Sequence, residues 1–212
     1  MLPRRLIHAA AAILAAQVAA GAALAHHPTG GMTPMTFMHG LLSGIGHPII
    51  GIDHFAFVVG MGLLAAIAGY GLMLPALFIG AMVAGLGVQL AGINVPAAEA
   101  MLAMSVLLIG VAVVRPREGQ GRWLEGGLFA LAGLLHGYAF AEAVIGAEPT
   151  PLMAYIIGLA ATQLAIAATV YHMASARPQR QAMLAPAVVR GVGMAIIAVG
   201  AVFLVLNSGG AA

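Results

Sequence analysis

The chain of 212 residues contains no cysteine and no lysine, and only 7% of its residues are charged. The absence of cysteine excludes disulfides and thiolate ligands, so any metal site must use imidazole, carboxylate or thioether groups. The scarcity of charge argues against the basic surfaces that bind nucleic acid. Hydrophobic residues make up 62% of the sequence, a larger share than in soluble domains. This composition predicts a membrane protein.

The first 25 residues are typical of a secretory signal peptide. Two arginines precede an alanine-rich apolar stretch, and Ala23-Leu24-Ala25 is a small-x-small cleavage site. Cleavage would leave residues 26–212 as a single transmembrane domain, with its new N-terminus on the outer or periplasmic side. A retained signal anchor is the alternative, because the apolar stretch is nearly long enough to span a bilayer.

Six further apolar stretches are long enough to cross the ~30 Å hydrocarbon core of a bilayer as helices. They run approximately from Gly51 to Gly69, Leu72 to Gly92, Pro96 to Val114, Arg122 to Glu142, Pro151 to Met173 and Val188 to Leu206. The two loops that carry arginine are expected in the cytoplasm, which puts the residues before Gly51 on the outer side. We therefore predict an all-α, multi-pass protein of a bacterial-type inner membrane, with six transmembrane helices.

The apolar stretch from Phe37 to Ile45 is too short to cross a bilayer. If it did cross, the mature N-terminus would be cytoplasmic, in conflict with signal cleavage. We therefore expect a half-helix or re-entrant segment that leads into His47, with a new helix starting near Pro48 because proline is favoured at a first helical position. A helix lying flat at the membrane interface is the alternative.

Ionisable residues gather in the segment His47-Pro48-Ile49-Ile50-Gly51-Ile52-Asp53-His54. An ionisable group inside a bilayer costs roughly 2.5–3.5 kcal/mol, so such a cluster needs a metal ion, a proton or one another as partner. In one unbroken helix His47 and His54 would lie about 10.5 Å apart along the axis, too far to bind one ion. Either the helix is broken or the two histidines act in succession. Asp53 is expected to bind the ion or to orient a neighbouring imidazole.

Other ionisable residues fall at the same predicted depth. His136 and Glu142 lie near the outer end of the fourth span, and Glu99 begins the third span on that side. Convergence from three parts of the chain favours one site over scattered buried side chains. Glu99 also suits a plain helix N-terminus, where the dipole favours a negative charge.

Three further histidines are weaker candidates. His39 belongs to the predicted half-helix, where it could line the re-entrant segment. His26 and His27 would follow the cleavage site and could capture metal with the freed amine. An unstructured tail is the alternative for these two.

Two motifs carry a resemblance to a known family. His47-Pro48-x-x-Gly51-x-Asp53-His54 and His136-Gly137-Tyr138-Ala139-Phe140-Ala141-Glu142 resemble the signatures of the HupE/UreJ family of nickel and cobalt permeases, membrane proteins that serve hydrogenase and urease. The resemblance covers nearly the whole chain after the signal. It implies import of Ni²⁺ or Co²⁺, with His47, Asp53, His54, His136 and Glu142 as the functional positions.

The second motif departs from the family pattern at two positions. Ala141 stands where glycine is expected, which would tighten helix packing. Phe140 occupies a place that carries an additional histidine in some members, so one nitrogen fewer is available to select the metal.

The residues alone leave the metal open, since imidazole and carboxylate ligands suit nickel, cobalt, zinc and copper(II). Met32, Met35 and Met38 would favour copper(I) if their thioethers bound metal, although methionine stripes are more often packing residues. We expect a transported divalent ion as the partner, the lipid bilayer as the surroundings and no resident cofactor.

Three other classes of protein share some of these features. An intramembrane protease needs a nucleophile with a base or a His-Glu-x-x-His motif, and the sequence offers neither, so no enzymatic activity is expected. A haem b electron carrier could use His54 and His136 as axial ligands. A metal sensor or metalloenzyme assembly factor would share the ligands without transport, so only flux separates it from a permease. The oligomeric state stays open.

Overall fold

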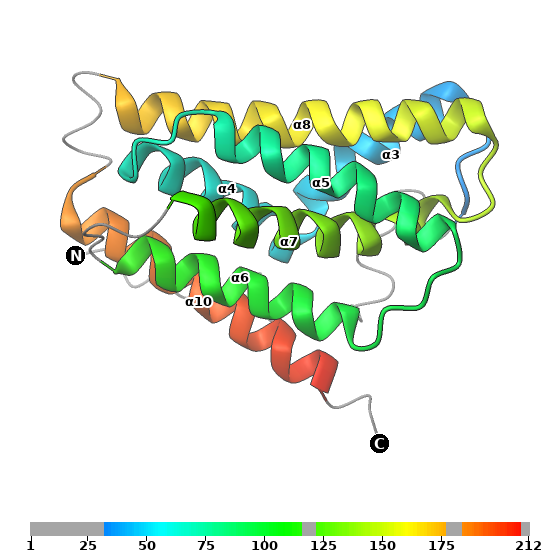
Figure 1. Cartoon of the computed structure of the whole chain (residues 1–212). Coiled ribbons are helices and arrows are strands. Elements are labelled where there is room, and N and C mark those ends of the chain that lie inside the picture. Colours follow the sequence, from blue (N-terminus) through cyan, green and yellow to red (C-terminus); the bar gives the residue numbers. More distant parts are fainter. Residues whose placement is uncertain (1–31, 116–121, 177–183, 209–212) are drawn as a thin grey trace, which may run out of the picture.

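Helices make up almost all of the described structure, a computed structural model that describes residues 32–115, 122–176 and 184–208 (Figure 1). The elements in chain order are α3 (Phe37–Ile50), α4 (Ile52–Ile67), α5 (Met73–Leu90), α6 (Ala98–Val114), α7 (Arg122–Phe140), the short 3₁₀ helix η1 (Ala141–Val144), α8 (Pro149–Ser175) and α10 (Pro186–Ser208). These ranges contain no strand, which confirms the all-α prediction. The predicted signal peptide, His26 and His27 lie outside the described residues.

The helices have the length and composition of a multi-pass membrane protein. Four of them can cross a bilayer by these measures: α5, α7 with its continuation through Val144, α8 and α10. The pair α3 and α4, bent by 77°, also qualifies, either as one broken span or as the predicted re-entrant segment. Helix α6 is apolar but has only 17 residues. The structure therefore shows four or five spans by length and composition, and the count of six stays a prediction.

The helices pack in pairs that bring their backbones close together. Helix α3 runs beside the first half of α8, where a Cβ atom on Gly40 would collide with the Pro151 backbone and one on Gly44 with the Tyr155 backbone. Helices α5 and α7 form a second close pair, and α6 packs against α10. Small residues at such contacts allow the close van der Waals packing that holds membrane helices together.

Helix α3 is longer than the predicted half-helix. It continues to Ile50 with Pro48 inside it, so the prediction that a new helix starts near Pro48 is wrong. A proline ring removes one backbone hydrogen bond, but packing of α3 against α8 supports the preceding turns. The chain leaves the helix three residues later, at Gly51, which has an extended conformation.

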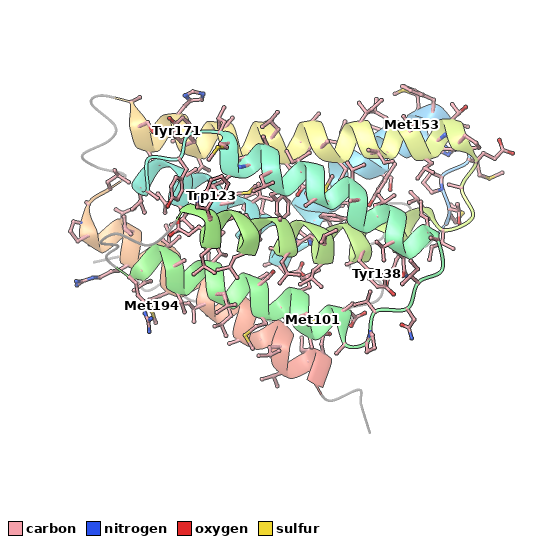
Figure 2. The ribbon with its side chains drawn as sticks, in the orientation of Figure 1. Met101, Trp123, Tyr138, Met153, Tyr171 and Met194 are labelled. Carbon is pink, nitrogen blue, oxygen red and sulfur yellow. The ribbon has the colours of Figure 1, made fainter. Side chains whose placement is uncertain are left out.

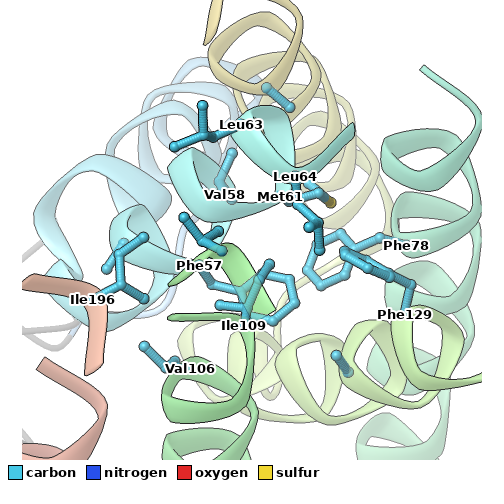
Figure 3. Close-up of a cluster of buried hydrophobic side chains, with 14 of the residues drawn as sticks. Phe57, Val58, Met61, Leu63, Leu64, Phe78, Val106, Ile109, Phe129 and Ile196 are labelled. Carbon is cyan, nitrogen blue, oxygen red and sulfur yellow. The ribbon is translucent and has the colours of Figure 1, made fainter. Parts of the chain in front are cut away.

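Two clusters of buried apolar side chains fill the bundle. The larger includes Phe57, Phe78 and Phe129 and joins α4, α5, α6, α7, α8 and α10 (Figure 3). The smaller includes Phe140 and Tyr155 and joins α5, the end of α7, η1 and α8. The outward faces are also apolar, and Figure 2 shows how strongly carbon dominates the side chains. A surface of this kind suits contact with lipid rather than water.

Candidate metal-binding site

The break between α3 and α4 brings the two histidines of the first motif together. The Gly51 amide donates to the His47 carbonyl at 3.0 Å and ends α3, and the Gly51 carbonyl accepts from the Phe55 amide at 2.8 Å to begin α4. Across the 77° bend, the His47 and His54 rings meet edge to face with centroids 5.6 Å apart. The broken-helix alternative is therefore the one that the structure adopts.

Gly51 is required at the bend because of a close approach. Its φ of −71° is open to any residue, but a Cβ there would lie 2.7 Å from Cδ2 of His54 and 3.3 Å from Oδ1 of Asp53. The first of these distances is a clash. The His54 ring can keep its place only if residue 51 has no side chain.

We expect Gly51→Ala to displace the His54 ring and weaken metal binding by about tenfold or more, the scale found when a ligand loses its orientation. Titration of purified protein with Ni²⁺ would measure the affinity. Gly80→Ala on α5, where a Cβ meets nothing within 4 Å, is the matched control. Equal affinities in the two variants would show that the position of the ring at the bend is unimportant.

Asp53 stabilises the start of α4. Its Oδ1 accepts a hydrogen bond from the His54 amide at 2.9 Å, and its side chain is buried. A carboxylate in the first turn of a helix also interacts favourably with the helix dipole. Asp53 therefore fixes the backbone that carries His54, and its predicted role toward an imidazole or an ion stays a prediction.

His54 and His136 join the two sequence motifs in one contact. Their Nδ1 atoms lie 3.1 Å apart, and their ring centroids 5.1 Å. The two side chains are 2% and 0% exposed, so the contact is closed off from the surface. Two nitrogens at this distance cannot both hold a proton between them. They share one proton or bind one cation.

Two hydroxyl groups form hydrogen bonds with the His47 and His136 rings. Tyr155 on α8 lies with its Oη 2.7 Å from Nδ1 of His47. Ser105 on α6 lies with its Oγ 3.1 Å from Nε2 of His136. Five helices, α3, α4, α6, α7 and α8, thus hold three imidazoles in a single polar cluster.

Aromatic rings enclose the imidazoles. Phe140 lies 4.1 Å from the His54 ring and 4.9 Å from the His47 ring, measured between centroids. Phe57 lies 4.4 Å from the His136 ring. Because Phe57 belongs to the larger apolar cluster and Phe140 to the smaller one, the imidazoles occupy the junction of the two. Such apolar walls exclude water and strengthen electrostatic interactions inside.

The remaining predicted residues differ from the imidazoles in being exposed. Glu142 is exposed on η1, Glu99 is exposed in the first turn of α6, and His39 is exposed on α3. In the described ranges 32–115, 122–176 and 184–208, no group of three or more His, Asp or Glu side chains is placed to hold one metal ion. The structure provides a buried pair of imidazoles, and ligation by Asp53 or Glu142 stays a prediction.

Sequence reasoning missed the two hydroxyl residues. Tyr155 is fully buried in the apolar part of α8, and Ser105 interrupts an apolar run in α6. A polar group within a membrane span is a signal in itself, because it needs a partner there. Its partner could not be named without the packing of the helices.

The fold and the imidazole cluster define the class: a multi-pass helical membrane protein with a buried, nitrogen-rich polar site. The family model described as HupE / UreJ protein matches residues 14–203. The chain therefore belongs to the HupE/UreJ family, which is associated with uptake of nickel and cobalt for hydrogenase and urease. Comparisons with curated proteins and with solved structures give no match.

Proposed function

We propose that this protein carries Ni²⁺ or Co²⁺ into the cell, and that the ion binds between Nδ1 of His54 and Nδ1 of His136. The observation that carries this proposal is the 3.1 Å separation of the two nitrogens in a buried site. Neutral imidazole is a common metal ligand. Membership of a metal-uptake family supports the choice of cargo.

The separation is compatible with one shared ion. With bonds of about 2.1 Å, adjacent ligands at right angles lie about 3.0 Å apart and tetrahedral ligands about 3.4 Å, so two nitrogens 3.1 Å apart can bind the same ion with little movement. The choice of nickel or cobalt rests on the family. Copper(II) binds most tightly in the Irving–Williams order and is the strongest expected competitor. A pair of nitrogens leaves the other positions to water or to further side chains, which suits an ion that must leave again.

The arrangement supports entry from the outer side. Helix α6 ends at Val114, which the exposed Arg115 follows, and α7 begins at Arg122 beside the exposed Trp123, so the arginine-bearing ends of the two helices lie at the same end of the bundle (Figure 1). The positive-inside rule assigns that end to the cytoplasm, and tryptophan is typical of the membrane interface. His136 lies four residues, or about 6 Å, before the opposite end of α7. The imidazole pair would then lie in the outer half of the membrane.

Uptake of radiolabelled nickel and cobalt into proteoliposomes tests this proposal. We expect uptake above that of protein-free vesicles, with copper(II) competing better than zinc. Metal binding without uptake would instead support a sensor or an assembly factor, a role that the closed burial of the pair also allows. A Soret band in the purified protein would point to haem b and contradict the proposal.

A further inference from the structure

Each of the two hydroxyls beside the imidazoles also forms a hydrogen bond to a backbone carbonyl, a different one in each case. Tyr155 donates its proton to the Phe140 carbonyl at 2.8 Å. Ser105 donates its proton to the Leu102 carbonyl at 2.7 Å. A hydroxyl carries a single proton, so once it has donated to a carbonyl it can only accept from another group.

This constraint fixes the protonated nitrogen on two rings. Tyr155 must accept a hydrogen bond from Nδ1 of His47, so that nitrogen carries a proton. Ser105 must accept from Nε2 of His136, so the proton of this ring is on Nε2. In the neutral rings, the lone pairs that a metal needs are then on Nε2 of His47 and Nδ1 of His136.

The tautomer of His54 follows from that of His136. Because Nδ1 of His136 holds a lone pair, the 3.1 Å contact is a hydrogen bond only if His54 donates from its own Nδ1. An ion entering between the two nitrogens takes the place of that proton, which moves to Nε2 of His54. His136 needs no such change, because its Nδ1 is already in the form that binds metal.

We propose that Tyr155 and Ser105 are positioning residues that fix the tautomers of His47 and His136, and that Ser105 thereby keeps the lone pair on Nδ1 of His136, the nitrogen that faces the ion. This inference rests on the proposed function and deepens it. Both hydroxyls come from helices outside the two sequence motifs, so residues elsewhere in the chain take part in setting these tautomers. Partners of this kind around a metal-binding histidine fix the ring and raise its basicity.

Nitrogen-15 NMR of full-length protein labelled at histidine, without metal, tests the tautomers directly. We expect Nδ1–H for His47 and Nε2–H for His136 in the wild type. Tyr155→Phe should convert His47 to a mixture of tautomers, and Ser105→Ala should do so for His136. Ser105→Thr keeps the hydroxyl and should keep the tautomer. Tyr138→Phe removes a hydroxyl that binds the Val95 amide instead, and is the matched control.

Nickel titration of the same proteins tests the consequence. We expect Ser105→Ala to bind about 10–100-fold more weakly, with Ser105→Thr and Tyr138→Phe near the wild type. The inference is overturned if the wild-type rings carry their protons on the opposite nitrogens, or if Ser105→Ala binds nickel as tightly as the wild type. Expected tautomers in a wild-type protein that binds no metal would overturn the proposed function and leave the hydroxyl assignment standing.

Discussion

Replacing His136 with phenylalanine is expected to lower nickel affinity and uptake by more than about 100-fold, and His54→Phe to do the same. Loss of a group that only orients a ligand costs about 10–100-fold, so loss of the ligand itself should cost more. Phenylalanine keeps a flat ring where Phe57 and Phe140 already contact these positions, so the bundle should still assemble. Nickel titration and vesicle uptake would measure the two effects.

A double-variant cycle makes this prediction specific to one shared ion. If both nitrogens bind the same ion, the double variant His54→Phe with His136→Phe should lose little beyond either single change. His172→Phe, on the exposed end of α8, is the matched control and should behave as the wild type. Losses that multiply in the double variant would indicate two independent sites.

The second large effect concerns helix packing beside the site. Gly137→Ala is expected to reduce the free energy of unfolding by about 1–3 kcal/mol or more, the cost of overpacking. A Cβ at this position would collide with the Met82 carbonyl, and α5 and α7 would have to separate. Because His136 is the preceding residue, nickel affinity should fall as well. Unfolding in detergent measures the first effect and titration the second.

Gly127→Ala provides the control on the same helix. A Cβ there meets nothing within 4 Å, so the change should be neutral or stabilise by up to about 1 kcal/mol, the gain in helix propensity. If both variants unfold at the same denaturant concentration, the close approach of α5 and α7 contributes nothing to stability.

The local part of the site could be predicted from sequence. Gly51 and Pro48 marked an irregular segment between His47 and His54, and the structure has its break at Gly51. Spacing alone showed that an unbroken helix would separate the two rings, and the bend removes that separation. The helix start predicted at Pro48 was wrong, because packing against α8 keeps α3 helical past this proline.

Depth along a span could be predicted, but the face of the helix could not. His136 and Glu142 are six residues apart, which is about 240° around a helix, so they share a depth without sharing a side. The structure buries His136 and exposes Glu142. Glu99 is exposed in the first turn of α6, where the dipole interpretation placed it. Tyr155 and Ser105 depend on helix pairing, which local sequence does not encode.

X-ray absorption spectroscopy of the nickel-loaded protein tests the central claim most directly, because it counts the imidazoles bound to the ion. We predict at least two imidazole nitrogens in the wild type, at about 2.1 Å, and one fewer in His54→Phe and in His136→Phe at saturating nickel. A shell made only of oxygen, or an unchanged imidazole count in either variant, would contradict binding between the two motifs.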